Sequence, residues 1–242
     1  MGGCTMQIVG PAQQDLCDEM DVLQRLLPFT GARVLELGCG AAAKTRQIAE
    51  RTAVREIVAA EVDRQQHEKN LAGGELPKVT FAAFGVEAIA VADATFDIVL
   101  MFKSLHHVPL DAMDQGLAEI YRVLKPGGLA YISEPVFAGA FNEVIRLFHD
   151  ESQVRQAAFA AVQRAVANNT FELQTEYFFK NVMRLDSFAQ FEEGILRATF
   201  MDHRLSDDLL AEVRHRFESH ATDDGYVFEI PNRVDLLRKP TA

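Results

Sequence analysis

Cysteine is scarce in this chain of 242 residues, which has only Cys4, Cys17 and Cys39. An odd and sparse set of cysteines does not suit a disulfide framework and is typical of a reducing compartment, so we expect a cytoplasmic protein. Cys39 stands between two glycines, with no histidine or aspartate close to it in the sequence. We therefore interpret it as a small turn residue and not as a nucleophile.

Long apolar runs and basic stretches are also missing. No apolar run approaches the roughly 20 residues of a membrane span, and the first residues lack the basic and apolar segments of a secretory signal. The chain carries 24 basic and 35 acidic residues, a formal net charge of -11. Because an acidic surface repels phosphate backbones, we expect neither a nucleic acid nor a membrane as a partner.

What the sequence does contain is a series of short apolar strands that alternate with helical segments. Strands are predicted at residues 33–37, 57–62, 79–84, 96–102 and 129–133, and helices at 41–51, 64–71 and 117–124. This alternation implies right-handed βαβ units and an α/β fold with a doubly wound, mostly parallel sheet. Ligands of such sheets bind at the carboxyl ends of the strands.

The regular alternation of strands and helices is limited to this core and does not extend to the segments on either side of it. A helix is predicted from Leu16 to Leu27, and after Pro135 helices are predicted at 141–168, 185–200 and 207–220, with a loose strand at 171–180 and two short strands at 226–230 and 234–238. We expect one domain in four parts: a helical cap (1–30), a cofactor-binding core (31–136), an insertion that covers the substrate (137–224) and antiparallel edge strands (225–242).

The first strand of the core ends in a glycine turn. Gly38, Cys39, Gly40 and Ala43 satisfy the loose dinucleotide fingerprint G-x-G-x-x-A, so an NAD(P)-dependent oxidoreductase is one interpretation. Glu36 argues against it, because a pyrophosphate at this turn would meet a like charge. A ligand with an ammonium group would instead be attracted by this carboxylate.

Four segments resemble the class I S-adenosylmethionine-dependent methyltransferases, especially the type 11-like small-molecule group. They are residues 34–40, 58–63, 96–101 and 124–132, in the order and spacing of that family. The resemblance implies a Rossmann-like, seven-stranded sheet with antiparallel C-terminal strands. It also implies transfer of a methyl group from S-adenosyl-L-methionine to a small-molecule nucleophile, with S-adenosyl-L-homocysteine as product. A cofactor-binding protein without catalysis is the second alternative.

The resemblance assigns the cofactor to the ends of the first two strands. Glu36 and the turn 38–40 would hold the methionine moiety, with main-chain N–H groups free to bind its carboxylate. Glu61 would accept both ribose hydroxyls, since a carboxylate has two oxygens for a diol. Asp63 competes for this role, and Val62 would flank the adenine.

The adenine contact departs from the pattern of the family. The acid that usually accepts from the adenine amino group aligns with Gly85. The contact would then come from the main chain of Gly85 or Val86, or from Glu87, whose alternative is an exposed loop acid. Ala42 replaces the third glycine of the family, which we expect to matter little in the first turn of a helix.

Lys103, His106 and His107 follow the fourth core strand. We expect Lys103 at the cofactor, and either histidine is a candidate to deprotonate a hydroxyl or amine before methyl transfer. The alternative is a histidine packed under the following helix. Adjacent histidines face different ways in a regular segment, so the sequence predicts no metal site.

The candidates for substrate contacts are Glu134, Phe141 and Arg146, at the start of the insertion. For Phe141 the alternative is an amphipathic helix that covers the sheet. The sequence leaves the acceptor and the quaternary state open, with a homodimer as one option.

Overall fold

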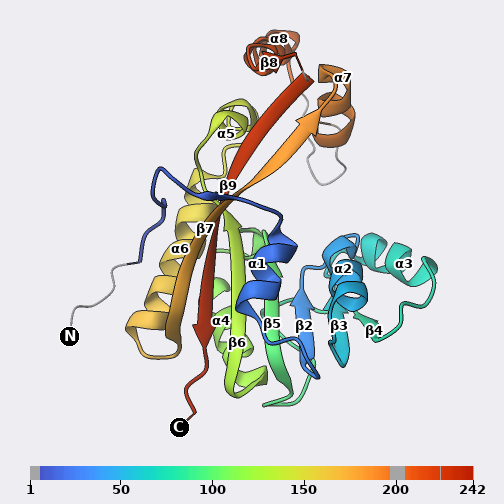
Figure 1. The fold of residues 1–242 in the computed structure, drawn as a ribbon, viewed down its shortest axis with the longest axis vertical. Coiled ribbons are helices and arrows are strands. Elements are labelled where there is room, and N and C mark those ends of the chain that lie inside the picture. The colour runs from blue at the N-terminus through green and yellow to red at the C-terminus, as the bar shows by residue number, and fades with distance from the viewer. Residues whose placement is uncertain (1–5, 197–204, 224, 242) are drawn as a thin grey trace.

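A single mixed sheet organises the protein, whose computed structural model describes residues 6–196, 205–223 and 225–241. The strand order is β1-β7-β9-β6-β5-β2-β3-β4, and β8 pairs with β9 (Figure 1). The strands are β1 (Asp15–Leu16), β2 (Arg33–Leu37), β3 (Glu56–Ala60), β4 (Val79–Ala82), β5 (Phe96–Phe102), β6 (Leu124–Pro135), β7 (Glu172–Leu185), β8 (Ala221–Thr222) and β9 (Gly225–Arg238).

Helices lie along the sheet and beyond its upper end. They are α1 (Glu19–Leu26), α2 (Ala43–Arg51), α3 (Arg64–Ala72), α4 (Met113–Val123), α5 (Ala140–Ile145), α6 (Ser152–Ala167), α7 (Phe188–Phe191) and α8 (Asp207–Glu218), with a 3-10 turn at Leu105–His107 and a π turn at Glu192–Leu196. None of these helices has the length and apolar character needed to cross a membrane.

The central strands are apolar on both sides because helices cover both faces of the sheet. In β5, Ile98 and Leu100 pack into one buried cluster with α1 and α2. Val99 and Met101 point the other way, into a second cluster with α4 and α6. The alternation of side chains along one strand thus joins the two helical layers through the sheet.

Strands β2 to β6 run parallel to their neighbours in this group. Their carboxyl ends therefore meet at one edge of the sheet, where the sequence places the candidate site. The α/β class, the mostly parallel sheet and the antiparallel C-terminal strands are confirmed.

The C-terminal part differs from the prediction in detail. Two edge strands were expected, but β9 is one strand that lies in the interior, antiparallel to both β6 and β7. It continues through Pro231 because β6 has already ended there, so the missing N–H group of the proline leaves no bond of the sheet unmade. The Pro231 carbonyl accepts from Val136 N at 2.9 Å, just beyond the end of β6. With β1 and β8, the described sheet has nine strands and not seven.

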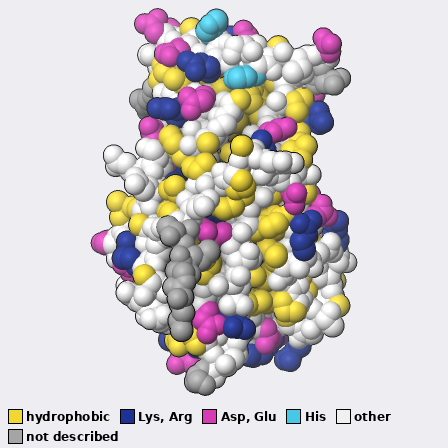
Figure 2. All heavy atoms as spheres, turned by 60° about the vertical axis from the view of Figure 1, so that its left-hand side comes forward, with side chains coloured by type: hydrophobic (Ala, Val, Ile, Leu, Met, Phe, Trp, Pro, Cys, Tyr) yellow, Lys and Arg dark blue, Asp and Glu magenta, His cyan; other side chains and the backbone are white. Residues whose placement is uncertain are grey.

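Above the end of β6, β7 and β9 continue as a two-stranded ribbon that carries α5, α7 and α8 (Figure 1). Phe188, Phe191, Phe217 and Phe228 form the centre of a separate buried cluster there, and we call this part the upper lobe. In the face drawn in Figure 2, acidic and basic side chains are interspersed among apolar ones.

Three helix predictions need correction. Leu16 belongs to β1 and not to the first helix, and the helix predicted at 141–168 is two helices, α5 and α6, with a break between them. The helix predicted at 185–200 begins only after β7 ends at Leu185, and residues 197–200 lie outside the described residues. The four-part division of the chain stays a prediction.

Candidate cofactor and acceptor site

The turn between β2 and α2 is built from residues with positive φ. Gly38 has φ +70° and Gly40 +52°, and glycine takes this conformation without steric cost. Ala42 has φ +58° and caps the start of α2. It was expected inside the first turn of the helix, where alanine is harmless. It instead holds a left-handed conformation that a side chain disfavours.

The main-chain N–H groups of this turn are engaged, contrary to the expectation that they are free. Gly38 N and Cys39 N donate to Ala60 O at 2.9 and 3.0 Å. Gly40 N donates to Glu61 Oε2 at 2.7 Å. These bonds tie the turn to the end of β3, so its shape is set before a ligand arrives.

Glu61 is therefore the acid that faces the glycine turn. Its side chain is buried, and its second oxygen accepts from Asp63 N at 2.9 Å. Asp63 is exposed and caps α3, where it accepts from Gln65 N at 2.8 Å. Of the two acids considered for the ribose, the structure brings Glu61 to the turn.

Glu36 is a buried carboxylate directly under the turn. Thr45 Oγ1 donates to its Oε2 at 2.6 Å. Burial raises the pKa of Glu36 to about 7, and the nearby Glu19 carboxylate acts in the same direction. Burial also raises the pKa of the Cys39 thiol to about 12, which makes it a poor nucleophile, as expected.

The predicted adenine contacts include the exposed side chain of Val62 and the carboxylate of Glu87, which lies beside Gly85. Val62 is 66% exposed at the end of β3, and Val86 is buried. A Cβ atom at Gly85 would lie 2.3 Å from Glu87 Oε2. The Glu87 carboxylate thus fills the space that a side chain at position 85 would occupy.

The segment after β5 touches the glycine turn. Ser104 Oγ donates to Leu37 O at 3.2 Å, and a Cβ atom at Gly38 would lie 2.9 Å from Ser104 Cβ. Lys103 is exposed and has φ +52°. Strained residues of this kind concentrate at functional sites, a signal that only the backbone conformation reveals.

His106 lies in a buried polar cluster that the sequence did not predict. Its Nδ1 is hydrogen-bonded to Glu134 Oε2, and its Nε2 lies 3.6 Å from Glu151 Oε1. Burial alone would lower the pKa of His106, but the bonds to Glu134 and Glu151 outweigh burial and raise it to about 9. A histidine with this pKa holds its proton near neutral pH and is a poor general base.

His107 is exposed, and its ring centroid lies 4.1 Å from that of His106. Burial of part of the ring lowers its pKa, and the charge of His106 adds to this effect. Glu151 and His149 come from the segment between α5 and α6 and bond to each other at 2.9 Å. A stretch about 45 residues away thus completes the cluster, so no local motif could have predicted it.

Comparison with known proteins shows which family the parallel half of the chain resembles. Residues 34–128 match a family model described as a methyltransferase domain, and this match spans the glycine turn, Glu61 and the histidines. This part of the chain is therefore similar to a methyltransferase domain.

The individual proteins that this chain resembles are distant relatives. Methyltransferase GfsG of Streptomyces halstedii is 30% identical over 125 residues, or 50% of this chain and 44% of GfsG. The structure of YcgJ from Bacillus subtilis covers 92% of this chain and 98% of its own, with a TM-score of 0.64 and 18% identity. That of Haemonchus contortus phosphoethanolamine N-methyltransferase 2 with S-adenosyl-L-methionine covers 91% and 52%, with a TM-score of 0.55 and 19% identity. The chain spans about half the length of the curated relatives it matches.

The three predicted substrate residues do not share one environment in the structure. Glu134 is buried and accepts from Leu105 N at 2.9 Å as well as bonding to His106. Phe141 packs in the upper lobe, with ring centroids 5.3 Å from Phe228. Arg146 lies near Glu143, with 3.4 Å between Nη1 and Oε1. Their contact with a substrate stays a prediction.

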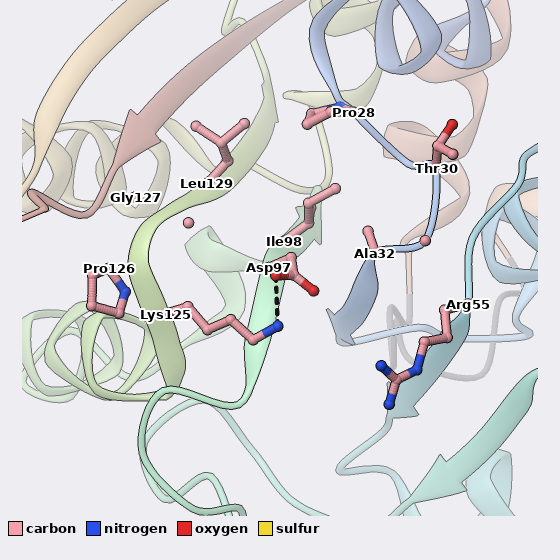
Figure 3. A pocket seen from close by; sticks show the side chains of 12 residues that line it. Pro28, Thr30, Ala32, Arg55, Asp97, Ile98, Lys125, Pro126, Gly127 and Leu129 are labelled. Carbon is pink, nitrogen blue, oxygen red and sulfur yellow. Dashed lines mark hydrogen bonds and ion pairs between the residues drawn. The ribbon is translucent and has the colours of Figure 1, made fainter.

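A hollow of about 440 Å³ lies at the opposite end of the sheet (Figure 3). It is lined by residues before β2, by Arg55 before β3 and by the amino ends of β5 and β6, which contribute the Asp97–Lys125 ion pair at 2.6 Å. Because parallel sheets bind ligands at the carboxyl ends of their strands, we do not assign the cofactor to this hollow.

Proposed function

We propose that the protein transfers a methyl group from S-adenosyl-L-methionine to a small-molecule nucleophile and releases S-adenosyl-L-homocysteine. The observation that carries the proposal is the bond from Gly40 N to the buried Glu61 carboxylate. This bond holds the carboxylate that we assign to the ribose diol against the turn that we assign to the rest of the cofactor.

The charge at this site fits a cationic cofactor better than a dinucleotide. Glu36 and Glu61 are buried at the ends of neighbouring strands, and Glu19 is buried near Glu36. Such a concentration of acid attracts an ammonium or sulfonium group and repels a pyrophosphate. This supports a methyltransferase over an NAD(P)-dependent oxidoreductase.

The remaining cofactor contacts follow from positions around the turn. Val62 offers an exposed apolar surface to the adenine, and Glu87 offers a carboxylate over Gly85 for its amino group. Val86 and Lys103 line the same end of the sheet. Together these residues fix the orientation of the cofactor, which is the main protein contribution to such a reaction.

Bound S-adenosyl-L-methionine supplies an electrophilic methyl group on a sulfonium. Glu36, Glu61 and the turn 38–40 would hold the cofactor, which would offer this methyl group to the acceptor atom. The protein excludes water and aligns the acceptor. We assign the lining of the acceptor side to the described residues of the insertion, 137–196 and 205–223, and the sparse cysteines favour a reducing, cytoplasmic setting.

Thermal unfolding with added ligands tests this proposal. S-adenosyl-L-homocysteine should raise the melting temperature, because a ligand at about 100 times its Kd adds roughly 2.7 kcal/mol to the free energy of unfolding. NAD should leave it unchanged. Glu61→Gln should weaken the binding of S-adenosyl-L-homocysteine by about 10- to 100-fold, which is the effect of losing a charged hydrogen bond.

Asp63→Asn is the matched control, since it removes an adjacent acid that caps α3. We expect near-normal binding from it. Stabilisation by NAD alone would overturn the proposal. Equal losses in both variants would move the ribose contact away from Glu61. Binding without turnover across a panel of metabolites would favour the non-catalytic alternative.

A further inference from the structure

We propose that His106, His107 and Glu151 bind a divalent first-row transition metal ion such as Zn²⁺. Their ligand atoms all lie within 4.8 Å of one another, the one such group among the described residues. The inference goes beyond the proposed function, because ion binding does not depend on methyl transfer. It also replaces the expectation from the sequence that no metal is bound.

That expectation assumed that the two histidines lie in a regular segment. Adjacent side chains diverge in a strand, but His106 and His107 lie in a 3-10 turn. Their ring centroids are only 4.1 Å apart. The turn therefore presents two imidazoles to the same region, next to Ser104, which touches the glycine turn.

The spacing of the ligand atoms suits a small ion. Bonds of about 2.0–2.1 Å to nitrogen and oxygen, at tetrahedral angles, separate two ligand atoms by about 3.3 Å. The distance from His106 Nε2 to Glu151 Oε1 is 3.6 Å. His149 Nε2 also lies 2.9 Å from this oxygen, but His149 is outside the group whose ligand atoms all lie within 4.8 Å of one another.

Glu134 orients His106 for this task. It is hydrogen-bonded to His106 Nδ1, and its other oxygen accepts from Leu105 N at 2.9 Å. This leaves Nε2 as the ring nitrogen that faces Glu151. A carboxylate behind a histidine is the usual outer support of a metal ligand.

Glu151 is held in a similar way. Arg155 donates to its Oε2 from Nη2 at 2.5 Å and from Nε at 3.0 Å. Oε1 remains directed toward the histidines. Two imidazoles and one carboxylate favour Zn²⁺, Fe²⁺ or Co²⁺ over Mg²⁺ and Ca²⁺, which prefer oxygen ligands alone.

Titration of the chelator-treated full chain with Zn²⁺, followed by calorimetry, tests the proposal. We expect one ion per chain and visible absorption bands of coordinated Co²⁺ when that ion is added instead. His107→Ala should weaken Zn²⁺ binding by at least 10-fold and abolish the bands. His215→Ala, on the exposed face of α8, is the matched control and should bind as the wild type does.

Glu151→Gln gives a second variant that keeps the side-chain volume, and circular dichroism checks the fold of each. The proposal is wrong if the wild type binds neither Zn²⁺ nor Co²⁺, or if His107→Ala and His215→Ala bind Zn²⁺ equally well. In either case the cluster is held together by hydrogen bonds through a proton and not by a metal ion. Binding of S-adenosyl-L-homocysteine is measured on the same samples. Its loss with Zn²⁺ binding intact would count against the proposed function alone.

Discussion

Gly38 shows how much of the site depends on the conformation of one residue. It shares its positive φ with Gly31, at +70° and +71°. Around Gly31 there is open space, whereas a Cβ at Gly38 would lie 2.9 Å from Ser104 Cβ. The two glycines therefore separate the cost of the backbone conformation from the cost of close contact.

Gly31→Ala should lower the free energy of unfolding by about 1–2 kcal/mol, the cost of a left-handed alanine. Gly38→Ala should lower it further, because Ser104 must move as well, and should weaken binding of S-adenosyl-L-homocysteine. Urea denaturation measures both. Equal destabilisation of the two variants would contradict the prediction, because it would show that Ser104 can move away from the new methyl group without a loss of stability.

At this scale the sequence predicts well what lies close together in the chain. Glu36, the glycine turn and Glu61 follow from a strand that ends at a turn and from the next strand end. The engaged N–H groups were missed, because a pattern does not show which acceptor reaches a donor. Glu151 was missed because its partner His106 lies far away in the sequence.

Among the elements, the ribbon of β7 and β9 is distinctive because it joins two separate cores. Its lower half pairs with β6 in the main sheet, and its upper half carries the upper lobe. Phe217 of α8 is fully buried there, with ring centroids 4.8 Å from Phe191 and 4.3 Å from Tyr226.

Phe217→Ala should therefore destabilise the upper lobe by about 3–5 kcal/mol, as large-to-small changes in cores do. Hydrogen exchange of α8 should accelerate, while S-adenosyl-L-homocysteine binds as before, since the glycine turn belongs to the main sheet. Val182→Ala, at a 37% exposed position of β7, is the control. Loss of cofactor binding in Phe217→Ala would mean that the lobe supports the cofactor site directly.

β2 and β5 were predicted with their observed bounds, because buried parallel strands are continuous apolar runs. β3 and β4 differ from their predictions by one or two residues at one or both ends, and β6 begins at Leu124 instead of residue 129 and ends at Pro135 instead of residue 133. β1 escaped notice because two residues carry no periodicity. The passage of β9 through Pro231 was hidden because proline normally ends a strand, and only the position of β6 shows that no donor is needed there.

For the molecule as a whole, buried carboxylates link stability to pH. Burial raises the pKa of Glu36 to about 7 and that of Asp235 to about 6. In the unfolded chain both groups release their protons near pH 4. Between these values each of the two groups binds fewer protons in the unfolded state than in the folded state, so their contribution to stability falls as pH rises from about 4.5 to 7.

Glu36→Gln should remove most of the Glu36 share of this decline, on the order of 3 kcal/mol, because the amide oxygen can still accept from Thr45. Urea denaturation from pH 4.5 to 7.5 should show that the free energy of unfolding of the variant increases relative to that of the wild type as pH rises. Glu75→Gln, at an exposed position, controls for the lost charge. Parallel curves for Glu36→Gln and wild type would contradict the prediction.

The interior place of β9 has a consequence for synthesis. Residues 225–238 leave the ribosome after both strands that they join. Until then β6 presents an open edge of unpaired N–H and C=O groups, although the parallel strands before it can already associate. The nascent protein therefore passes through a stage with an exposed edge that invites pairing with other chains, and the insertion of its last strand removes that hazard.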